Sequence, residues 1–596
     1  MTASLDLGVI GNCQVGALID GWGRNVWTCL PRFDSDPLFC GLLSGRDTDS
    51  SDGIFAIDVK DAARASQSYL RNTAILETII HDEHGAAVRI LDFCPRFPLY
   101  GRVFRPVMLV RIIEPVADHP VVTVRLRPRW NYGENEPRRT MGSNHINFRG
   151  DGFTLRLTTD LSLSAVLEER PFLLRERLSF VLGPDEPVTE SVGSLAHRFF
   201  EETHRYWVTW ARGLAIPFDW QEEVIRAAIT LKLCTFEDTG AIIAAMTTSI
   251  PEAAASGRNW DYRYCWLRDS YFTIKALNRL GATRTMERYV AYIANIVAAS
   301  DSSPLQPLYG ITGAPVLEER SIDSLPGYRG MGPVRVGNAA YVQQQNDVYG
   351  SVILAATQAF FDSRLARPGD DLMFEQLQAA GERCVELYDQ PDAGIWEYRG
   401  RENVHTFSSV MCWSGVHHLV KIARQLGLQE RASYWQGKAD EMHARVCAEA
   451  WNEGLGSFTE SWGSPTVDAS LLLLVDLGFL PPDDPRFAGT VELISQRLVH
   501  NGYVFRYRTA DDFGRPENAF TICTFWYINA LVSLGRREEA CAIFERMLSR
   551  RNALGLLSED LDPATGELWG NFPQTYSLVG IINSAMRLSR SWEEAL

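Results

Sequence analysis

The chain has 596 residues, more than one ordinary hydrophobic core accommodates, so two or more domains are expected. Its composition, with 46% hydrophobic and 22% charged residues, is that of a folded globular protein and excludes wholesale disorder. The formal net charge of -16 disfavours a nucleic-acid partner, which would select a basic surface, and leaves a neutral small molecule open as a ligand.

Cysteine usage and hydropathy favour a protein without disulfides or membrane contacts. The chain has 11 cysteines but no CxxC pair, which disfavours a zinc ribbon or a thioredoxin-like motif. The first residues lack a basic stretch followed by a long apolar run, and no apolar stretch reaches about 18 residues. We therefore expect a cytoplasmic protein with reduced thiols and no membrane partner. Whether copies of the chain associate into a homo-oligomer stays open.

No metal or organic cofactor is expected. The run His81-Asp82-Glu83-His84 is rich in metal-ligand types, but it lies between two apolar runs and ends in Gly85, as a hairpin turn does. His417 and His418 are adjacent in a predicted helix, so their side chains diverge by about 100° and do not readily share one ion. The nucleotide-binding, serine-hydrolase and zinc-protease motifs are also missing from the sequence.

The first third of the chain is predicted to be β-structure. Short apolar runs alternate with turn residues in the segments 73–80, 81–85, 86–93, 121–130, 146–150 and 153–159. This spacing is typical of antiparallel strands joined by hairpins. A large β-sandwich over residues 1–195 is the natural way to bury such strands.

Helical periodicity begins near residue 196. Segment 196–217 is amphipathic and is predicted to be a linker helix, and residues 218–596 are predicted to form an all-helical domain. We expect about twelve helices in this domain by periodicity. Their predicted cores are 219–235, 267–280, 284–298, 344–361, 371–388, 407–426, 429–450, 467–476, 485–499, 520–534, 537–549 and 574–590.

The connections between these helices alternate between short and long. Such an alternation suits an (α/α)6 toroid, in which an inner ring of helices is surrounded by an outer ring. Loops 236–266, 299–342 and 500–519 would then gather at one rim, where binding and catalytic residues are commonly found. Periodicity alone is also compatible with other helical arrays.

Two of the long loops carry residues suited to holding a sugar. The run from Arg258 to Ser270 combines aromatic side chains with Arg268 and Asp269 at a predicted helix start, and this pair could hold neighbouring hydroxyl groups. A structural ion-pair network explains the same residues equally well. Arg506, which precedes two aspartates in a Gly-rich loop, could bind a hydroxyl group or a carboxylate.

Two glutamates stand in contexts that suit acid–base chemistry. Glu397 lies between Trp396 and Tyr398, and apolar flanks favour the protonated form that a general acid needs. A solvated loop glutamate is the alternative interpretation. Glu559 follows an apolar run, so its side chain is expected to point inward, or else to cap a helix or turn. Some of the 16 tryptophans could stack on sugar rings.

Taken together and in this order, the segments resemble glycoside hydrolase family 15, the family of glucoamylases, glucodextranases and trehalases. The resemblance runs along nearly the whole chain. The residues that carry it are 7–13, 29–35, 247–252, 259–269, 325–329, 333–340, 394–397, 520–526 and 570–574.

The resemblance implies an N-terminal antiparallel β-supersandwich followed by an all-α (α/α)6 toroid that carries the catalytic site. It also implies an inverting, exo-acting hydrolase that releases glucose from the non-reducing end of α-glucosides such as trehalose, malto- or isomalto-saccharides. Glu397 matches the family's general acid and Glu559 its general base. The residues matching the substrate-binding positions are Arg268, Asp269 and Arg506, with Trp266, Trp396 and Tyr309 as aromatic walls.

The chain departs from the family's pattern at three places. His417-His418 stand where similar bacterial proteins tend to carry an Asp-Arg pair, Asn518 stands where Gly is frequent, and Asp560 stands where a second Glu is common. None of these removes a matched carboxylate, so we expect them to affect the leaving-group subsite. Small α-glucosides are favoured as substrates, because a cytoplasmic enzyme seldom meets starch.

Two other functions stay open from the sequence. An α-glucoside phosphorylase of similar architecture uses phosphate in place of water and lacks the base carboxylate, so Glu559 argues against it. A catalytically silent glucan-binding protein would have lost one of the two carboxylates, and both are retained.

Overall fold

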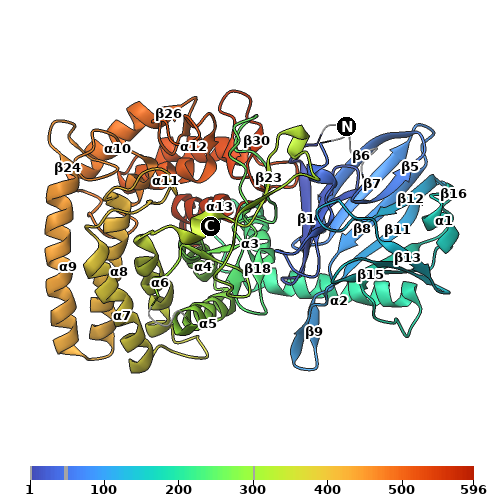
Figure 1. The fold of residues 1–596 in the computed structure, drawn as a ribbon, viewed down its shortest axis with the longest axis horizontal. Coiled ribbons are helices and arrows are strands. Elements are labelled where there is room, and N and C mark those ends of the chain that lie inside the picture. Colours follow the sequence, from blue (N-terminus) through green and yellow to red (C-terminus); the bar gives the residue numbers. More distant parts are fainter. Residues whose placement is uncertain (1–2, 46–51, 300–302, 596) are drawn as a thin grey trace.

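The computed structural model describes residues 3–45, 52–299 and 303–595. In Figure 1 a β-rich unit, formed by the first third of the chain, lies beside a helical unit formed by the remainder. Among the described helices, none is long and apolar enough to cross a membrane.

Two antiparallel sheets face each other in the β-rich unit. One has the strand order β1-β2-β3-β5-β12-β16 with β4 paired to β3, and the other has the order β13-β14-β15-β17-β11-β8-β7-β6. The strands of the first sheet are β1 (Leu7–Gly11), β2 (Gly16–Asp20), β3 (Asn25–Cys29), β4 (Pro37–Phe39), β5 (Ile54–Val59), β12 (Val121–Arg127) and β16 (Phe172–Leu173). Those of the second are β6 (Ala62–Tyr69), β7 (Leu76–Asp82), β8 (Ala87–Phe93), β11 (Leu109–Ala117), β13 (Arg138–Met141), β14 (His145–Arg149), β15 (Thr154–Thr159) and β17 (Leu178–Pro184).

One apolar core fills the space between the sheets. Ile10 and Phe55 of the first sheet pack in it with Ile90 and Phe180 of the second. The predicted hairpin at His81-Asp82-Glu83-His84 is confirmed, because β7 and β8 are neighbours joined through these residues. The backbone N–H of Asp82 donates to the carbonyl of Ala86, which closes the turn.

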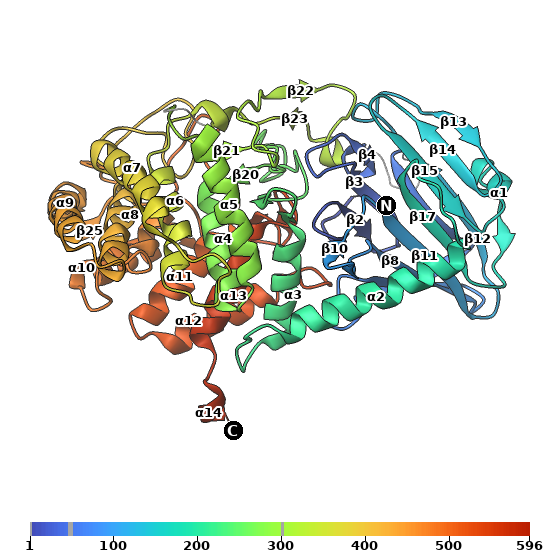
Figure 2. The same ribbon diagram turned by 90° about the horizontal axis from the view of Figure 1, so that it is seen from below.

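Helix α2 (Val192–Arg212) connects the two units and packs on both. It begins ahead of the predicted segment 196–217 because the hydroxyl of Ser191 accepts a hydrogen bond from the backbone N–H of Ser194 and caps the helix. Leu195 and Phe199 pack on the outer face of the eight-stranded sheet, and Figure 2 shows the helix running along it. Farther along, Trp207 is buried in the core of the helical unit.

The helical unit contains, over its described residues, nearly every helix that the periodicity predicts. These are α3 (Gln221–Leu233), α4 (Leu267–Arg279), α5 (Thr283–Ala299), α6 (Asp347–Thr357), α7 (Asp371–Leu387), α8 (Thr406–Gln425), α9 (Gln429–Ala450), α10 (Pro485–Leu498), α11 (Thr521–Ser533), α12 (Arg537–Leu548) and α13 (Thr575–Leu588). The remaining short α-helices are α1 (Leu163–Leu167) and α14 (Trp592–Ala595).

The predicted helix over 467–476 is wrong in type. The segment forms the short 3-10 helix η5 (Ala469–Leu473), which Asp468 caps by accepting from the backbone N–H of Ser470. Gly478 adopts a φ of 75° and prolines follow at 481 and 482, so the chain turns away before an α-helix can extend.

The helices close into the predicted toroid. Helices α4, α6, α8, η5, α11 and α13 contact one another in this order, and α13 returns to α4. Helices α3, α5, α7, α9, α10 and α12 pack against this ring from outside. The residues of α11 from Thr521 to Leu531 are all buried, as expected of an inner helix that is covered on every side.

The long loops gather at one end of the ring, as predicted. Strand β20 (Cys265–Trp266) of the first loop pairs with β21 (Leu308–Tyr309) of the second. The guanidinium of Arg258 donates to the carboxylate of Asp511 in the third loop at 2.8 Å. The loops therefore hold one another by backbone pairing and by charged hydrogen bonds.

Candidate active site

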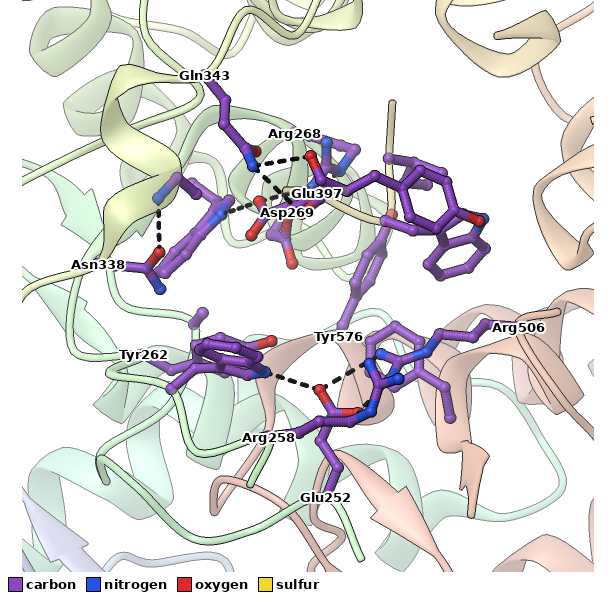
Figure 3. A pocket seen from close by; sticks show the side chains of 18 of the residues that line it. Glu252, Arg258, Tyr262, Arg268, Asp269, Asn338, Gln343, Glu397, Arg506 and Tyr576 are labelled. Atoms are coloured by element: carbon purple, nitrogen blue, oxygen red, sulfur yellow. Dashed lines mark hydrogen bonds and ion pairs between the residues drawn. The ribbon is translucent and has the colours of Figure 1, made fainter. Parts of the chain in front are cut away.

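A polar pocket opens among these rim loops. Two groups of charged side chains face each other across it (Figure 3), one formed by Glu397, Arg268 and Asp269 and the other by Glu252, Arg258 and Arg506. Tyr262 and Tyr576 lie between the two groups. Of the eight site residues expected from the sequence, six line this pocket: Glu397, Arg268, Asp269, Trp266, Trp396 and Arg506.

Glu397 is held at the pocket wall by side chains from two segments, 266–268 and the segment that contains Gln345. The indole Nε1 of Trp266 donates to its Oε1 at 2.7 Å, and Nε2 of Gln345 donates to the same oxygen at 3.3 Å. The guanidinium of Arg268 lies 3.7 Å from Oε1, and the side chain stays 22% exposed. The carboxyl group is thus oriented yet reachable. Its surroundings are more polar than its aromatic sequence neighbours suggested.

The Arg268–Asp269 pair begins the inner helix α4, where the loop enters the ring. Arg268 donates to Oε1 of Gln345 at 2.9 Å and to Oδ2 of Asp347 at 3.2 Å. Burial raises the pKa of Asp269 to about 6, while the nearby charge of Arg268 lowers it and that of Glu397 raises it. The pair therefore belongs to an ion-pair network, as one interpretation of the sequence predicted, and it also lines the pocket. Its binding of sugar hydroxyl groups stays a prediction.

The opposite wall is organised by Glu252, which was not singled out from the sequence. Its carboxylate pairs with the guanidinium of Arg506, and its Oε1 accepts from Nε1 of Trp260 at 2.9 Å. Arg506 thus lines the pocket as predicted, but two of its nitrogens are committed to Glu252. The only sequence signal for Glu252 was its place in the segment 247–252 that carries the family resemblance.

Glu559 lies behind the pocket surface and is fully buried. Its Oε2 accepts from the backbone N–H of Asn571 at 3.2 Å, and Tyr262, which does line the pocket, lies next to it. Burial raises the pKa of the Glu559 carboxyl, and the negative charge of Glu252 raises it further. The inward orientation expected from the sequence is confirmed.

Trp396 and Tyr309 were both expected to be aromatic walls, and only Trp396 is one. The indole Nε1 of Trp396 donates to Oδ2 of Asp468 at 2.7 Å, which fixes the ring at the pocket. Tyr309 is not among the lining residues. It is paired in register with Cys265, whose side chain enters the main core, whereas Trp266 and its partner Leu308 lie on the other face.

The family departures fall in two separate places. Neither His417 nor His418 lines the pocket. His417 stacks on Trp413 with ring centroids 5.0 Å apart, and His418 lines a different cavity with Lys275 and Asp476. The expectation that this pair affects the leaving-group subsite is therefore wrong. Asn518 and Asp560, the other two departures, both line a cavity next to the pocket.

Within the described part of the chain, no group of three or more His, Cys, Asp or Glu side chains is arranged to hold a metal ion. The pocket instead offers carboxylates, guanidinium groups and aromatic rings. Such a set can bind hydroxyl groups by charge-assisted hydrogen bonds and can move protons, which is the chemistry of glycosidic bond cleavage.

Comparisons with known proteins agree with this chemistry. The family model described as glycosyl hydrolases family 15 matches residues 220–586, and one described as trehalase-like, N-terminal matches residues 5–159. A protein of Thermoplasma volcanium named trehalase is 32% identical over 99% of this chain and 93% of its own length. A Mycobacterium tuberculosis protein named trehalase is 33% identical over 99% of this chain and 90% of its own.

Solved structures agree on the fold. A bacterial glucoamylase, solved in complex with acarbose, superposes with a TM-score of 0.70 at 14% identity, covering 99% of this chain and 94% of the other. This likeness confirms the predicted order of a β-sandwich followed by an (α/α)6 toroid. The chain therefore belongs to family 15 of the glycosyl hydrolases, and the predicted inverting α-glucoside hydrolase is confirmed.

Proposed function

We propose that this protein hydrolyses α,α-trehalose, with Glu397 as general acid and Glu559 as general base. The observation that carries the proposal is the presence of two carboxyl groups of different character, one at the wall of the pocket and one behind it. Glu397 is partly exposed at the pocket wall, whereas Glu559 is fully buried next to Tyr262, in the loop that precedes α13. The trehalose preference is supported by full-length relatives that are named trehalase.

In the proposed reaction a water molecule attacks the anomeric carbon of one glucose. Glu559 takes a proton from this water as the new C–O bond forms, and Glu397 gives its proton to the glycosidic oxygen as the old bond breaks. The second glucose leaves, and the enzyme is left with Glu559 protonated and Glu397 ionised. The resting enzyme is restored when Glu559 has lost its proton to solvent and Glu397 has taken one up.

The same geometry supports roles in substrate binding. We propose that Asp269 and Arg268 hold hydroxyl groups of the glucose whose bond is cleaved, since Oδ2 of Asp269 has no hydrogen-bond partner within the described residues. Trp266 and Trp396 would supply the apolar faces on which the ring rests. We propose that the Glu252–Arg506 pair lines the same subsite as a unit.

Glucose release tests the proposal directly. Purified protein is assayed with trehalose, maltose, isomaltose and soluble starch, and kcat/KM is compared. The highest kcat/KM is expected for trehalose. A higher kcat/KM for another glucoside would reassign the substrate, and formation of glucose 1-phosphate in phosphate buffer would favour a phosphorylase.

A further inference from the structure

A second polar cavity of about 180 Å³ lies directly behind the pocket wall. Glu252, Arg258 and Phe513 line both spaces, so these side chains form the partition between them. Arg515 and Glu517, which also line the cavity, are exposed to solvent and do not line the substrate pocket. Its volume is ample for several waters, each of which needs about 10–15 Å³.

Asp560 lines this cavity and follows the proposed base directly in sequence. Its side chain is buried, and its Oδ2 has no hydrogen-bond partner among the described residues. Gly570 brings the two carboxyl groups together, since the position its missing Cβ would occupy lies 2.8 Å from Oε2 of Glu559 and 3.1 Å from Oδ2 of Asp560. The carboxyl group of Asp560 therefore lies close to Glu559 and also lines the rear cavity.

The proposed reaction leaves Glu559 holding a proton that it must lose before the next turnover. Glu559 does not line the substrate pocket, and Tyr262 of the pocket wall lies next to it. A sugar bound in the substrate pocket would also block the path of this proton through the pocket to solvent. The rear cavity offers polar partners for water along its length, namely Glu252, Ser256, Arg258, Asn518 and Asp560.

We infer that Asp560 and the water in this rear cavity carry the proton from Glu559 to solvent while the sugar occupies the front pocket. The inference rests on the proposed role of Glu559. In the transfer, Asp560 gives its proton to a cavity water and receives one from Glu559, so Asp560 is unchanged and Glu559 returns to its ionised form. Asp560 acts through Glu559 and does not contact the substrate.

The charge around Asp560 suits a carrier that rests in its protonated form. Burial raises the pKa of Asp560, the charges of Glu252 and Glu559 raise it further, and those of Arg506 and Arg258 lower it. A neutral asparagine therefore resembles the resting aspartic acid in shape and charge but cannot transfer the proton. This makes Asp560→Asn an informative variant.

The test compares kcat and KM of the wild type, Asp560→Asn and Asp560→Glu on trehalose. For Asp560→Asn we expect kcat to fall about tenfold or more and KM to stay unchanged. The loss of a general acid or base itself typically costs about 10²–10⁴-fold, so a positioning residue that acts through the base should cost less. Imidazole, which is small enough to enter the cavity, should restore kcat as its concentration rises, whereas the bulky buffer HEPES at the same pH should not. Asp560→Glu should keep most of the activity.

Two further variants complete the design. Asp562→Asn removes a carboxylate from the same loop, where it caps a turn by accepting from the backbone N–H of Ala564, and should show normal kcat and no response to imidazole. Ala253→Leu fills the cavity from its wall and should lower kcat with Asp560 intact, which covers the case of an unstable Asp560→Asn.

The outcomes separate this inference from the proposed function. An active wild type whose Asp560→Asn variant keeps normal kcat, or loses it without response to imidazole, overturns the proton route alone. If Asp560→Asn does not fold and Ala253→Leu keeps normal kcat, the route is also overturned. A wild type that releases glucose from no α-glucoside overturns the proposed function instead.

Discussion

Glu397 has an unusual backbone conformation for its residue type. Its φ of 58° lies in the left-handed region, which costs a residue with a side chain on the order of 1–3 kcal/mol. The surrounding loop compensates, since Nε2 of Gln343 donates to the carbonyls of Glu397 and Tyr398 at 3.2 Å each. The strained conformation directs the carboxyl group toward the pocket, where Trp266 fixes it.

Replacing Glu397 with glutamine tests its role as the acid. The amide keeps the shape of the side chain but cannot give up a proton to the glycosidic oxygen, so kcat should fall by about two orders of magnitude or more. KM should change little, because the sugar-binding residues are untouched. The matched control is Glu402→Gln, which alters an exposed glutamate of the same loop. Activity within a few-fold of the wild type would contradict the assignment.

The buried position of Glu559 predicts how activity depends on pH. The base works in its ionised form, and its pKa is raised by burial and by the charge of Glu252, so kcat/KM should fall as pH drops through that pKa. This fall in kcat/KM should occur at a higher pH than the pKa of an exposed glutamate, which is about 4.3. Glu252→Gln removes a negative charge and frees Arg506, so the acidic limb should move to lower pH.

The measurement for this prediction is kcat/KM on trehalose as a function of pH, which reports the free enzyme. Glu402→Gln serves as the comparison, since it removes an exposed carboxylate that lines neither cavity. An acidic limb that stays in place in Glu252→Gln would show that Glu252 and the base are not coupled.

At the scale of elements, the loop before α13 depends on a glycine. Gly570 adopts a φ of 73°, and a Cβ there would lie 2.7 Å from the Cβ of Glu559 and 2.8 Å from its Oε2. Gly570→Ala should therefore displace the base and lower kcat strongly, in addition to the conformational cost of about 1–2 kcal/mol. Kinetics on trehalose and a thermal unfolding curve measure the two effects.

Gly566→Ala separates strain from displacement. Gly566 lies in the same loop with a φ of 78°, and the nearest atoms to its missing Cβ belong to the flexible side chain of Arg550. It should lose stability but keep kcat. Equal losses of kcat in both variants would mean that the loop as a whole, and not the contact with Glu559, sets the rate.

Most helices could be predicted because their periodicity and their ends are local properties of the sequence. The segment 467–476 is the exception, because it forms a 3-10 helix in place of the predicted α-helix. An apolar run of this length is compatible with both, and the glycine and two prolines that follow it stop an α-helix from extending. Helix α2 was placed late because the cap at Ser191 precedes the amphipathic pattern.

The site could be predicted only where a residue stood in a recognisable motif. Glu252 escaped because its importance arises from Arg506, a partner 254 positions away. Tyr309 was misplaced because one position along a strand moves a side chain to the opposite face, which the pairing register alone decides. Long-range partners and strand register are tertiary properties, so a motif does not encode them.

At the scale of the whole molecule, the β-sandwich supports the site from behind. Arg263, which follows Tyr262, donates to the carbonyl of Ser35 at 2.8 Å and to the hydroxyl of Tyr132 at 2.9 Å. Nε1 of Trp27 donates to the carbonyl of Met246 at 2.8 Å. The loop that carries Tyr262, Trp266 and Arg268 is thus fastened to the N-terminal unit on one side and to the helical ring on the other.

The stereochemistry of the products depends on how far apart the molecule holds its two catalytic carboxyl groups. An inverting pair of carboxyl groups stands roughly 6.5–9.5 Å apart so that water fits beside the anomeric carbon, whereas a retaining pair stands about 5–5.5 Å apart. Glu397 and Glu559 belong to different loops, and the inverting mechanism of the family predicts the wider separation for this pair. Trehalose should therefore yield one β-glucose, from the attacked unit, and one α-glucose, from the unit that leaves with its own C–O bond intact.

Proton NMR of the first products, recorded before mutarotation, should show the two anomers in equal amounts. In water labelled with oxygen-18 the label should enter the β-anomer alone, because only the attacked carbon receives oxygen from water. Glu397→Gln provides the control for glucose formed without the enzyme's chemistry. If only α-glucose formed at first, the attacked carbon would have kept its configuration, and Glu559 would have to act as a nucleophile instead of a base.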